Sequence, residues 1–584
     1  MKPYANLRKR KILSEVAMGN SPADIVITNG RLFNAFTGEF IDGQSIWIKE
    51  GMIAYVGPDQ HAAHGEKTEC IDADGMVLLP GLIEAHTHLL SSRYGIEEFI
   101  RHVIPCGVTT VVTEAVEFNE IVGKEGLDYV LKGFRDQPIR LYCTFPPMCG
   151  LTPSEEIYSL QGDDILPRLQ DPFCLGIGEV YWSNLLLEGE QGQRLRELVS
   201  LALDEGKVIE GHTAGASKKK LQAYTCFGIS SCHEPISEEE VLERLRLGFW
   251  VLIREGYVRK ELNGIKGIFQ RDIDFRRLAL VTDGVGPEEF LESGYLDGSL
   301  RRALKLGAPP KVAYQMVTLN PAEHFHLDHM IGALAPGKLA DILISPSPQE
   351  FSPRLVMCDG KVLFRDGKTL AEPKNVYFPD HMLHSVKIQN TAFPALPVTG
   401  KVRTIELVTR LVTREKIVNL DSSNELKQLN LVCALDRTEG DRKFMGYLKG
   451  FGLKEGAYGT TMCWDTRDLI AVGCDHQSIK TVVERLRAIG GGGVLAVGEQ
   501  IIAEFSAPVC GITSLERMEI IRDQTRRLDT SLRERGVPWE TPILTVDTLG
   551  TAAIPHIRIN HDGYVNLRDR RVLPVEVASI APLC

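Results

Sequence analysis

Five short segments of the chain end in residues whose side chains can coordinate a metal ion. The first reads PGLIEAHTH and places two imidazoles, His86 and His88, one residue apart after an apolar run. The other four end in single candidate ligands, Glu179, His212, His233 and Asp283. Imidazole and carboxylate without thiolate suit zinc, manganese or iron(II). The set is large enough for two ions if a carboxylate bridges them, and Glu179 is the residue best placed to do so.

These residues follow short apolar runs that alternate with segments of helical period between about residues 80 and 330. The alternation is typical of βα units, and eight parallel strands close a barrel. The eight runs are 82–87, 107–113, 139–145, 174–179, 207–213, 228–233, 249–255 and 278–283. In a (β/α)8 barrel, polar side chains at the carboxyl ends of the strands converge on one mouth. We therefore expect the six candidate ligands to form one cluster there.

The segments around the barrel have other patterns. Residues 23–57 alternate β-branched or aromatic runs with Asn-Gly, Thr-Gly, Asp-Gly and Glu-Gly turns, which predicts a small antiparallel sheet. A similar pattern returns after the barrel, so the barrel is predicted to be an insertion in a small β-sandwich domain. A linker and a C-terminal α+β domain follow. The predicted boundaries are 1–79, 80–330, 331–375, 376–400 and 401–584.

Local signals add detail to this outline. Ser237 with Glu240 has the spacing of a capping box at a helix start, and Pro287 suits a first helical turn. The glycine run 490–493 is followed by no Lys-Ser/Thr pair, so we interpret it as a turn and not as a phosphate-binding loop.

Composition and charge exclude several classes of protein. A net charge of -11 argues against a general nucleic-acid binder. No run approaches the roughly 20 apolar residues that span a bilayer, and no signal-peptide core follows the basic opening NLRKRK. The 13 cysteines are scattered without a CxxC motif, which favours a reducing compartment. We expect a cytoplasmic protein that binds neither nucleic acid nor membrane.

Each candidate ligand also has a structural interpretation when it is considered alone. A single histidine such as His212 is more often hydrogen-bonded than metal-bound, Glu179 could cap a loop, and Asp283 could N-cap the next helix. Cys232, beside His233, fits a small buried apolar residue better than a ligand. The metal site is favoured because all six candidates fall at the ends of independently assigned strands.

The same segments resemble a known family. PGLIEAHTH, the later glutamate, the two single histidines and the Thr-Asp pair are the pattern of the amidohydrolase superfamily, and the detail is similar to its adenine deaminase family. The resemblance covers nearly the whole chain, including GVTTVV, GIGEV, GHTAGASKKKLQAY, GISSCHE, GALAPGKLADILI, YLKGFGLKEGAYGTT and LRAIGGGGVLAVG. It implies a metal-dependent deaminase with two divalent ions, most often manganese or iron, and a C-terminal domain peculiar to the family.

Four segments depart from the family pattern. Glu114-Ala115-Val116-Glu117 replaces the usual Asp-Pro-His-Glu, and Leu90 stands where a glutamate is usual. Gly284-Val285-Gly286 replaces a polar Asp-Arg-His, and Cys463-Trp464-Asp465-Thr466-Arg467 replaces a histidine-containing segment. The candidate ligands are kept while residues around them become apolar or smaller, which indicates altered substrate choice more than loss of activity.

The ligand set predicts hydrolysis by an activated water. A divalent ion lowers the pKa of bound water toward roughly 7. Asp283 would take the proton and pass it to the leaving nitrogen, so the predicted catalytic residues are Asp283 and Glu179. For adenine, attack at C6 releases ammonia and forms hypoxanthine. Arg254 and Glu255, at the end of the seventh run, are candidates for binding a heterocycle, with a structural ion pair or loop anchor as the alternative.

Two other functions stay open at this stage. One is hydrolysis of another cyclic amidine, amide or imide, and the other is a non-catalytic binding protein on the same scaffold. Zinc is an alternative to manganese or iron. The expected partner is a small heterocyclic molecule, and a chain of this size with a large appended domain predicts a homo-oligomer, most simply a dimer.

Overall fold

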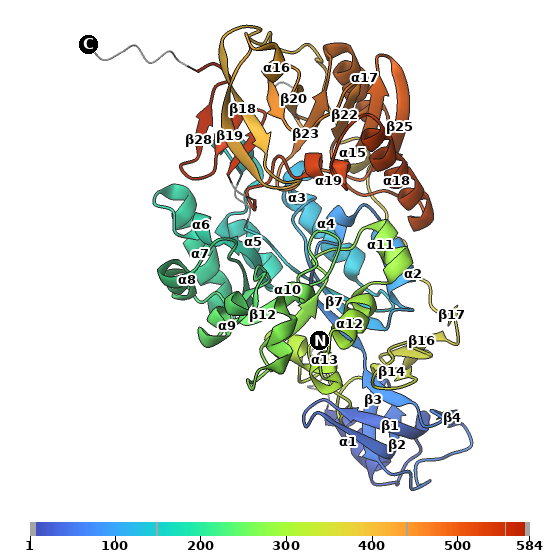
Figure 1. Ribbon diagram of the computed structural model, residues 1–584. Coiled ribbons are helices and arrows are strands. Elements are labelled where there is room, and N and C mark those ends of the chain that lie inside the picture. Colours follow the sequence, from blue (N-terminus) through green and yellow to red (C-terminus); the bar gives the residue numbers. More distant parts are fainter. Residues whose placement is uncertain (1–6, 148–149, 440–441, 555, 578–584) are drawn as a thin grey trace.

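The computed structural model describes residues 7–147, 150–439, 442–554 and 556–577. Three parts are stacked along the long axis of the molecule: a β-rich region, a barrel and a C-terminal domain (Figure 1). The barrel, cyan to green, lies between the blue strands and the orange to red domain. Within the described residues, no helix is long and apolar enough to cross a membrane.

The barrel consists of eight parallel strands, which match the eight predicted runs. Five form a sheet in the order β10-β9-β8-β7-β6, and three form a sheet in the order β11-β12-β13. The strands are β6 (Leu82–Thr87), β7 (Val108–Glu114), β8 (Arg140–Thr144), β9 (Cys174–Tyr181), β10 (Val208–His212), β11 (Ser231–Cys232), β12 (Trp250–Arg254) and β13 (Leu278–Val281). Two backbone hydrogen bonds join the sheets, from Ser230 to Ile209 and from Asp283 to His86, so the barrel closes.

Alternate residues of a strand point to the same side, which explains how the barrel aims its polar groups. Val112, Leu252 and Val281 belong to one apolar cluster inside the barrel. Each of these residues is followed two positions later by a polar residue, namely Glu114, Arg254 and Asp283 respectively. These three polar residues therefore face the interior at the carboxyl end, above the apolar cluster.

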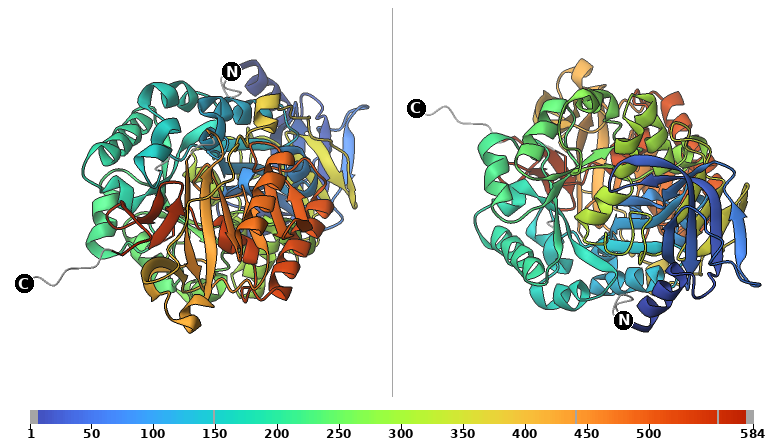
Figure 2. Two further views of the ribbon diagram at one scale, coloured as in Figure 1. Left: turned by 90° about the horizontal axis from the view of Figure 1, so that it is seen from above. Right: turned by 90° about the horizontal axis from the view of Figure 1, so that it is seen from below.

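Helices follow the strands and cover the outside of the barrel (Figure 2). They are α2 (Ile96–Val103), α3 (Asn119–Val122), α4 (Lys124–Phe134), α5 (Gly162–Leu169), α6 (Trp182–Leu185), α7 (Glu190–Asp204), α8 (Lys218–Thr225), α9 (Glu238–Arg246), α10 (Leu262–Ile265), α11 (Pro287–Ser293), α12 (Leu296–Lys305), α13 (Pro310–Gln315) and α14 (Leu319–His324). The described residues also include the short 3-10 turns η2 (Leu90–Ser92), η3 (Pro153–Tyr158) and η4 (Lys266–Gln270).

The predicted helix signals are confirmed at two starts. The Ser237 side chain accepts a hydrogen bond from the backbone of Glu240 at the start of α9, and Pro287 lies in the first turn of α11. Gly286 is the N-cap of α11. The alternative in which Asp283 caps this helix is therefore wrong.

Segments before and after the barrel form one nine-stranded sheet. Its path is β17-β16-β15-β14-β5-β1-β2-β3, with β4 paired to β1. The strands are β1 (Ile25–Asn34), β2 (Glu39–Lys49), β3 (Met52–Gly57), β4 (Glu69–Asp72), β5 (Val77–Pro80), β14 (Ile342–Ser345), β15 (Leu355–Cys358), β16 (Lys361–Arg365) and β17 (Lys368–Thr369). Because β5 precedes the barrel and pairs with β14 after it, the barrel is inserted in this sheet.

The predicted antiparallel sheet in residues 23–57 is confirmed, because β1, β2 and β3 pair antiparallel. The larger sheet is mixed, because β1 also pairs in parallel with β4 and β5. Residues 58–68 carry the chain from β3 back to the other edge of β1. Turn residues predict hairpins between adjacent strands, but they do not predict this longer connection. Ile53 of β3 and Met357 of β15 share one apolar cluster although their strands lie far apart in the path. The sheet therefore curls around this core in the manner of a sandwich. Helix α1 (Leu7–Ala17) packs Leu13 and Val16 into a neighbouring cluster that includes Trp47.

The C-terminal domain contains an eight-stranded sheet, ordered β19-β18-β21-β20-β23-β22-β24-β25, and a three-stranded sheet, β26-β27-β28. Its strands are β18 (Lys401–Leu407), β19 (Thr413–Asn419), β20 (Leu429–Asp436), β21 (Lys443–Lys449), β22 (Ala457–Thr460), β23 (Asp468–Gly473), β24 (Gly492–Val497), β25 (Gln500–Ser506), β26 (Ile557–Asn560), β27 (Gly563–Asn566) and β28 (Arg571–Leu573). Its helices are α16 (Ser423–Leu426), α17 (His476–Ala488), α18 (Met518–Glu534) and α19 (Pro542–Asp547).

The glycine run between α17 and β24 is a turn, as predicted. Gly490, Gly491 and Gly492 all have positive φ angles, and a Cβ on Gly492 would lie 2.0 Å from the carbonyl oxygen of Phe505. Only glycine fits there without displacing the backbone of β25.

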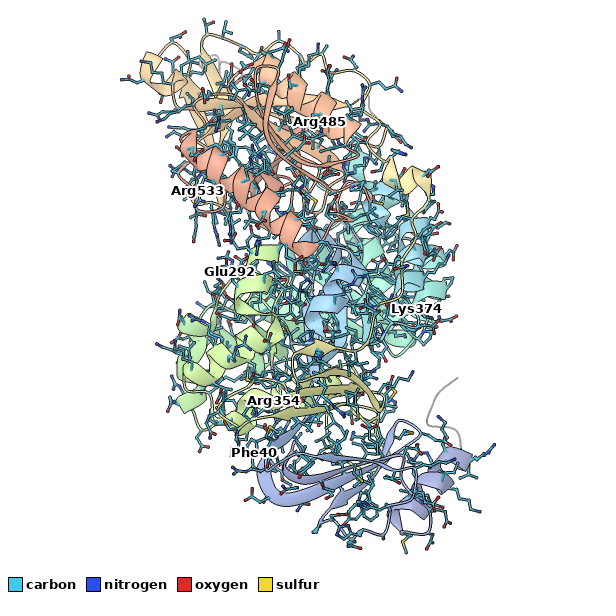
Figure 3. All side chains as sticks on the ribbon, turned by 90° about the vertical axis from the view of Figure 1, so that its right-hand side faces the viewer. Phe40, Glu292, Arg354, Lys374, Arg485 and Arg533 are labelled. Carbon is cyan, nitrogen blue, oxygen red and sulfur yellow. The ribbon has the colours of Figure 1, made fainter. Side chains whose placement is uncertain are left out.

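The C-terminal domain lies over the carboxyl end of the barrel. Arg93, just after η2, forms a buried ion pair with Asp547 of α19 at 2.5 Å. At the edge of the junction, Arg526 of α18 pairs at 2.6 Å with Glu292 of α11, which Figure 3 labels. The predicted linker, residues 376–400, contains α15 (Asp380–Leu383) and buries Met382 and Ile388.

Candidate metal centre

The structure brings the six predicted ligands together at the carboxyl end of the barrel. Their donor atoms fall into two groups, and within each group all donor atoms lie within 4.8 Å of one another. One group consists of His86, His88, Glu179 and Asp283, and the other consists of Glu179, His212 and His233. Glu179 belongs to both groups, which is the arrangement a bridging carboxylate requires.

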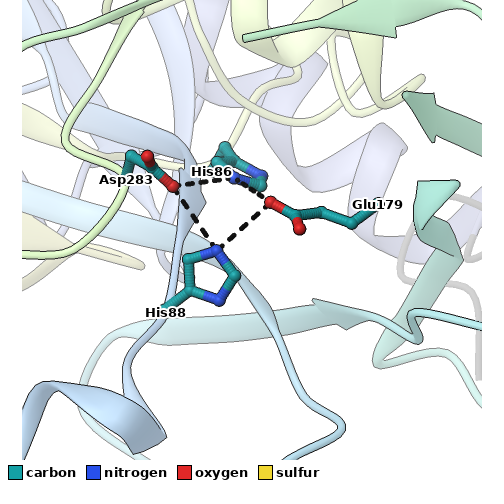
Figure 4. A group of neighbouring side chains, drawn as sticks. All are labelled: His86, His88, Glu179 and Asp283. Atoms are coloured by element: carbon teal, nitrogen blue, oxygen red, sulfur yellow. Dashed lines mark hydrogen bonds and ion pairs between the residues drawn. The ribbon is translucent and has the colours of Figure 1, made fainter. Parts of the chain in front are cut away.

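Glu179 lies at the centre of the cluster. Its Oε1 is 3.3 Å from Nε2 of His86 and 3.3 Å from Nε2 of His88, and Figure 4 shows these contacts. The same oxygen is 3.2 Å from Nε2 of His233, and Oε2 is 3.8 Å from Nδ1 of His212. Asp283 closes the first group, with Oδ1 3.3 Å from Nε2 of His86 and 3.4 Å from Nε2 of His88.

The donor set fits divalent metal ions. Nε2 of His86 and both ring nitrogens of His212 are buried, and none of them has a hydrogen-bond partner among the described residues. Buried polar atoms are normally paired, so unpaired imidazole nitrogens that face shared carboxylates need an explanation. Coordination of an ion by nitrogen and oxygen donors provides one.

The backbone at both carboxylates is strained. Glu179 has a φ of 43° and Asp283 a φ of 56°, in the left-handed region that side chains other than glycine rarely adopt. Such conformations cost on the order of 1–3 kcal/mol each and are concentrated at functional sites. Both carboxylates contact His86 and His88 from these backbone positions.

The charges of the cluster reinforce one another. Burial acts to raise the pKa of Asp283, but contacts with His86 and His88 and the charge of Arg254 hold it well below its usual range. Burial acts to lower the pKa of His86, but contacts with Asp283, Glu114 and Glu179 raise it well above its usual value. If the same nitrogens hold an ion, its binding would release protons from them.

Three carboxylates that were not nominated from the sequence also belong to the site. Oε1 of Glu114 is 3.5 Å from Nδ1 of His86, and Oε1 of Glu117 is 3.9 Å from Nδ1 of His88. Such partners on the outer nitrogen orient a ligating imidazole. Oε1 of Glu234 is 3.3 Å from Nε2 of His233. Glu114 and Glu234 follow predicted strand runs, so their position was a usable signal, whereas Glu117 lies on the loop beyond β7.

The two candidate substrate-binding residues have different positions. Arg254 lines the mouth, where its NH1 is 2.6 Å from Oε1 of Glu234 and 3.3 Å from Oδ2 of Asp283. Glu255 does not face the mouth, and that expectation is wrong. Its carboxylate pairs with Arg302 of α12 at 2.6 Å and accepts a hydrogen bond from the backbone of Leu262. Consecutive strand residues point to opposite sides, so these two could not share the cavity.

A cavity of about 280 Å³ opens above the ligands. The barrel contributes Val116 and Gly284–Gly286 to its lining, and the C-terminal domain contributes Met462, Cys463, Trp464 and Asp465. Three of the four departures from the family pattern therefore lie on the cavity wall. The fourth, Leu90, is buried, and its carbonyl accepts a hydrogen bond from Thr513.

Three other predicted or departing positions, Cys232, Thr466 and Arg467, are absent from the cavity lining. Cys232 is buried with its Sγ 2.6 Å from Oγ1 of Thr213, in keeping with a small buried residue. Thr466 and Arg467 contact the barrel loop at Glu155 and Ser154. These residues join the two domains.

Comparison with known proteins agrees with this architecture. The chain matches the amidohydrolase family model over residues 77–363 and the adenine deaminase C-terminal domain model over residues 402–571. It is 32% identical to an adenine deaminase of Archaeoglobus fulgidus over 98% of this chain and 99% of that protein. It is 32% identical to one of Moorella thermoacetica, over 97% of each chain, and 30% identical to one of Dehalococcoides mccartyi, over 97% of this chain and 99% of that protein. With both domain models matched and relatives of this identity covered over nearly their full length, the chain belongs to the adenine deaminase family of the amidohydrolase superfamily.

Proposed function

We propose that this protein deaminates adenine hydrolytically, giving hypoxanthine and ammonia. The observation that carries the proposal is the pair of donor groups that share Glu179 and face a cavity covered by the C-terminal domain. The full-length relatives named adenine deaminase support the choice of substrate. At about 280 Å³ the cavity is near the lower end of the usual range for small-molecule sites, as a flat base without a sugar requires.

We assign two divalent ions to the centre, manganese or iron, with zinc as the alternative. His86, His88, Glu179 and Asp283 would hold one ion, and Glu179, His212 and His233 the other. When bound, the ions supply Lewis-acid activation, so that water loses a proton near neutral pH. The outer carboxylates Glu114 and Glu117 orient two of the imidazoles.

Asp283 is suited to move the proton. Its Oδ1 faces His86 and His88, and its Oδ2 faces Arg254, so the carboxylate is ionised and fixed in position. As the water oxygen bonds to C6 of adenine, Asp283 accepts the proton and returns it to the amino nitrogen. The C6–N bond then breaks and ammonia leaves. Arg254 holds the carboxylate in place and stabilises its ionised form.

The test is a turnover assay on protein loaded with manganese, iron or zinc in parallel. Hypoxanthine is followed by its absorbance, ammonia is measured independently, and metal content is determined on the same samples. Stoichiometric formation of both products, lost after chelation and restored by one of the metals, is the expected result. Light scattering on the loaded protein tests the homodimer that we also propose.

A second candidate is hydrolysis of another cyclic amidine, amide or imide. It is favoured by Val116 and Gly284–Gly286 in the cavity lining. These residues are smaller and less polar than those of the family pattern at the same positions. A screen of such rings distinguishes the two, because opening an amide ring consumes substrate without releasing ammonia. Failure of the fully loaded protein to turn over any of these compounds would favour a binding protein on the same scaffold.

A further inference from the structure

Glu120 is a buried carboxyl group in the cavity that has no part in the metal centre. It lies on the short helix α3, after β7, is 5% exposed and lines the cavity. Its Oε1 is buried without a hydrogen-bond partner among the described residues. A carboxyl group left unpaired in this way is costly unless something else pairs with it.

Asp465 of the C-terminal domain is a second carboxyl group on the same wall. Its Oδ2 accepts hydrogen bonds from the hydroxyls of Tyr181, at 3.0 Å, and Thr551. No described residue donates a hydrogen bond to its Oδ1. The residue has a φ of 55°, so its position is held by the surrounding structure against an unfavourable backbone conformation.

The two carboxyl groups line the same cavity, where the charge of Asp465 acts on Glu120 and the charge of Glu179 acts on Asp465. Burial, followed by the charges of Asp465, Glu117 and Glu155, raises the pKa of Glu120 well above its usual value. Burial and the charge of Glu179 raise the pKa of Asp465, although hydrogen bonds from Thr551 and Tyr181 oppose the shift. Burial and the neighbouring negative charges therefore both favour the protonated form of the Glu120 carboxyl.

A protonated carboxyl group offers one donor and one acceptor side by side. That pair is complementary to a ring edge on which an N–H group and an unprotonated nitrogen flank one carbon, as N9 and N3 do in adenine. The cavity lining also includes the apolar side chains of Val116, Met462 and Ile512. In such a pocket a few polar groups fix the orientation of the ligand.

We propose that Glu120, beside Asp465, recognises the ring-nitrogen edge of the substrate and so selects a purine whose N–H and ring nitrogen share one edge. The proposal rests on the proposed deamination, because it assigns the specificity of that site. Glu120 is thus a specificity-determining residue, and the reacting amino group lies toward the ligand cluster.

The experiment compares the wild-type protein with Glu120→Gln and Glu120→Leu. Adenine and 3-deazaadenine, in which a CH replaces one ring nitrogen, are the two substrates. An amide keeps one donor and one acceptor, so Glu120→Gln should retain kcat/KM for adenine to within about threefold. Glu120→Leu should lose about 10- to 100-fold, the effect of an unpaired polar group in a site. The preference for adenine over 3-deazaadenine should fall toward one in Glu120→Leu and persist in Glu120→Gln.

Binding of hypoxanthine, measured by calorimetry on the same metal-loaded proteins, provides a readout independent of turnover. Glu120→Leu should weaken it about as much as it lowers kcat/KM. Metal content and thermal melting are measured for each variant, and Glu120→Met replaces Glu120→Leu if the latter does not fold.

The outcomes separate the two proposals. Adenine turnover with an unchanged preference ratio in Glu120→Leu overturns the role of Glu120 and leaves the deamination standing. Binding of purines without deamination overturns the proposed function. In that case the affinity of Glu120→Leu for hypoxanthine, compared with that of the wild-type protein, still tests whether Glu120 binds the purine. A wild-type protein that binds neither purine overturns both.

Discussion

The floor and the roof of the cavity are built on different principles. The floor consists of the ligands at the ends of barrel strands, and its backbone is hydrogen-bonded into one closed framework. The roof comes from the C-terminal domain, with Met462, Trp464 and Asp465 arriving from a separate sheet. The barrel keeps every candidate ligand but also contains three of the four departures from the family pattern, whereas the roof contains the fourth.

The difference shows where reaction and selection are encoded. Parallel strands in a barrel end at one rim, so any polar residue placed there joins the same cluster. The roof residues line the cavity only because the C-terminal domain packs on the barrel. They can therefore be substituted without disturbing the residues at the ends of the barrel strands. We therefore expect floor substitutions to affect turnover most, and roof or junction substitutions to affect selectivity and stability.

The largest effect is expected for Asp283→Asn in the floor. The amide keeps the size and one oxygen donor but cannot accept the proton, so kcat should fall by roughly 10²–10⁴-fold. Metal content must be measured on the same sample. Lost activity with metal retained supports proton transfer by Asp283, loss of both supports a ligand role alone, and wild-type activity with normal metal rejects the mechanism.

Arg93→Met tests how firmly the roof is fixed to the floor. The change leaves Asp547 buried without its partner, which typically destabilises a protein by about 3 kcal/mol or more. Chemical denaturation should show the loss, and Arg93→Met combined with Asp547→Leu should recover most of it. Equal stability of the single variant and the wild-type protein would mean that the ion pair does not hold the domains together.

Arg254→Ala and Glu255→Gln form a matched pair at the end of one strand. Arg254 contacts Glu234 and Asp283, and hydrogen bonds to charged groups are worth about 1.5–3 kcal/mol, so kcat/KM should fall about 10- to 100-fold. Glu255 faces Arg302 outside the cavity, so Glu255→Gln should keep kcat/KM to within about twofold and lower thermal stability instead. Unchanged kinetics in Arg254→Ala would remove that residue from the site.

The smallest effect concerns His561 at the junction of roof and floor. Its Nδ1 is 2.7 Å from Oδ1 of Asp468, and its Nε2 is 2.8 Å from Oγ of Ser154 in η3. Burial acts to lower the pKa of His561, but the charge and hydrogen bond of Asp468 raise it to about 9. The folded pKa lies above the unfolded value of about 6.5, so this stabilisation is complete below that pH and is lost as pH rises through 9.

Thermal melting between pH 7 and 10 tests this contribution. The wild-type midpoint should fall more steeply than that of His561→Gln, which has no proton to lose in this range. Parallel pH profiles of the two proteins would show that the ion pair adds nothing to the junction.

Much of the floor could be predicted because its signals are local. Each strand is one short apolar run, and each ligand follows its run directly, so His212 or Asp283 could be assigned without knowing any neighbour in space. The error at Glu255 was avoidable, since adjacent strand residues alternate in direction. The turn signals of residues 23–57 correctly predicted the antiparallel pairing of β1, β2 and β3. The parallel pairing of β1 with β4 and β5 could not be predicted in this way, because it depends on how residues 58–68 return the chain.

By itself, the sequence determined the eight-stranded barrel, its insertion in a β-rich domain and the six residues at one rim. These follow from periodicity and from position at strand ends, which act over a few residues. Tertiary structure alone decided that Glu120 of α3 and Asp465 of the C-terminal domain line one cavity. Such neighbours are set by the packing of two domains, because the groups lie hundreds of residues apart and no local pattern records the distance between them.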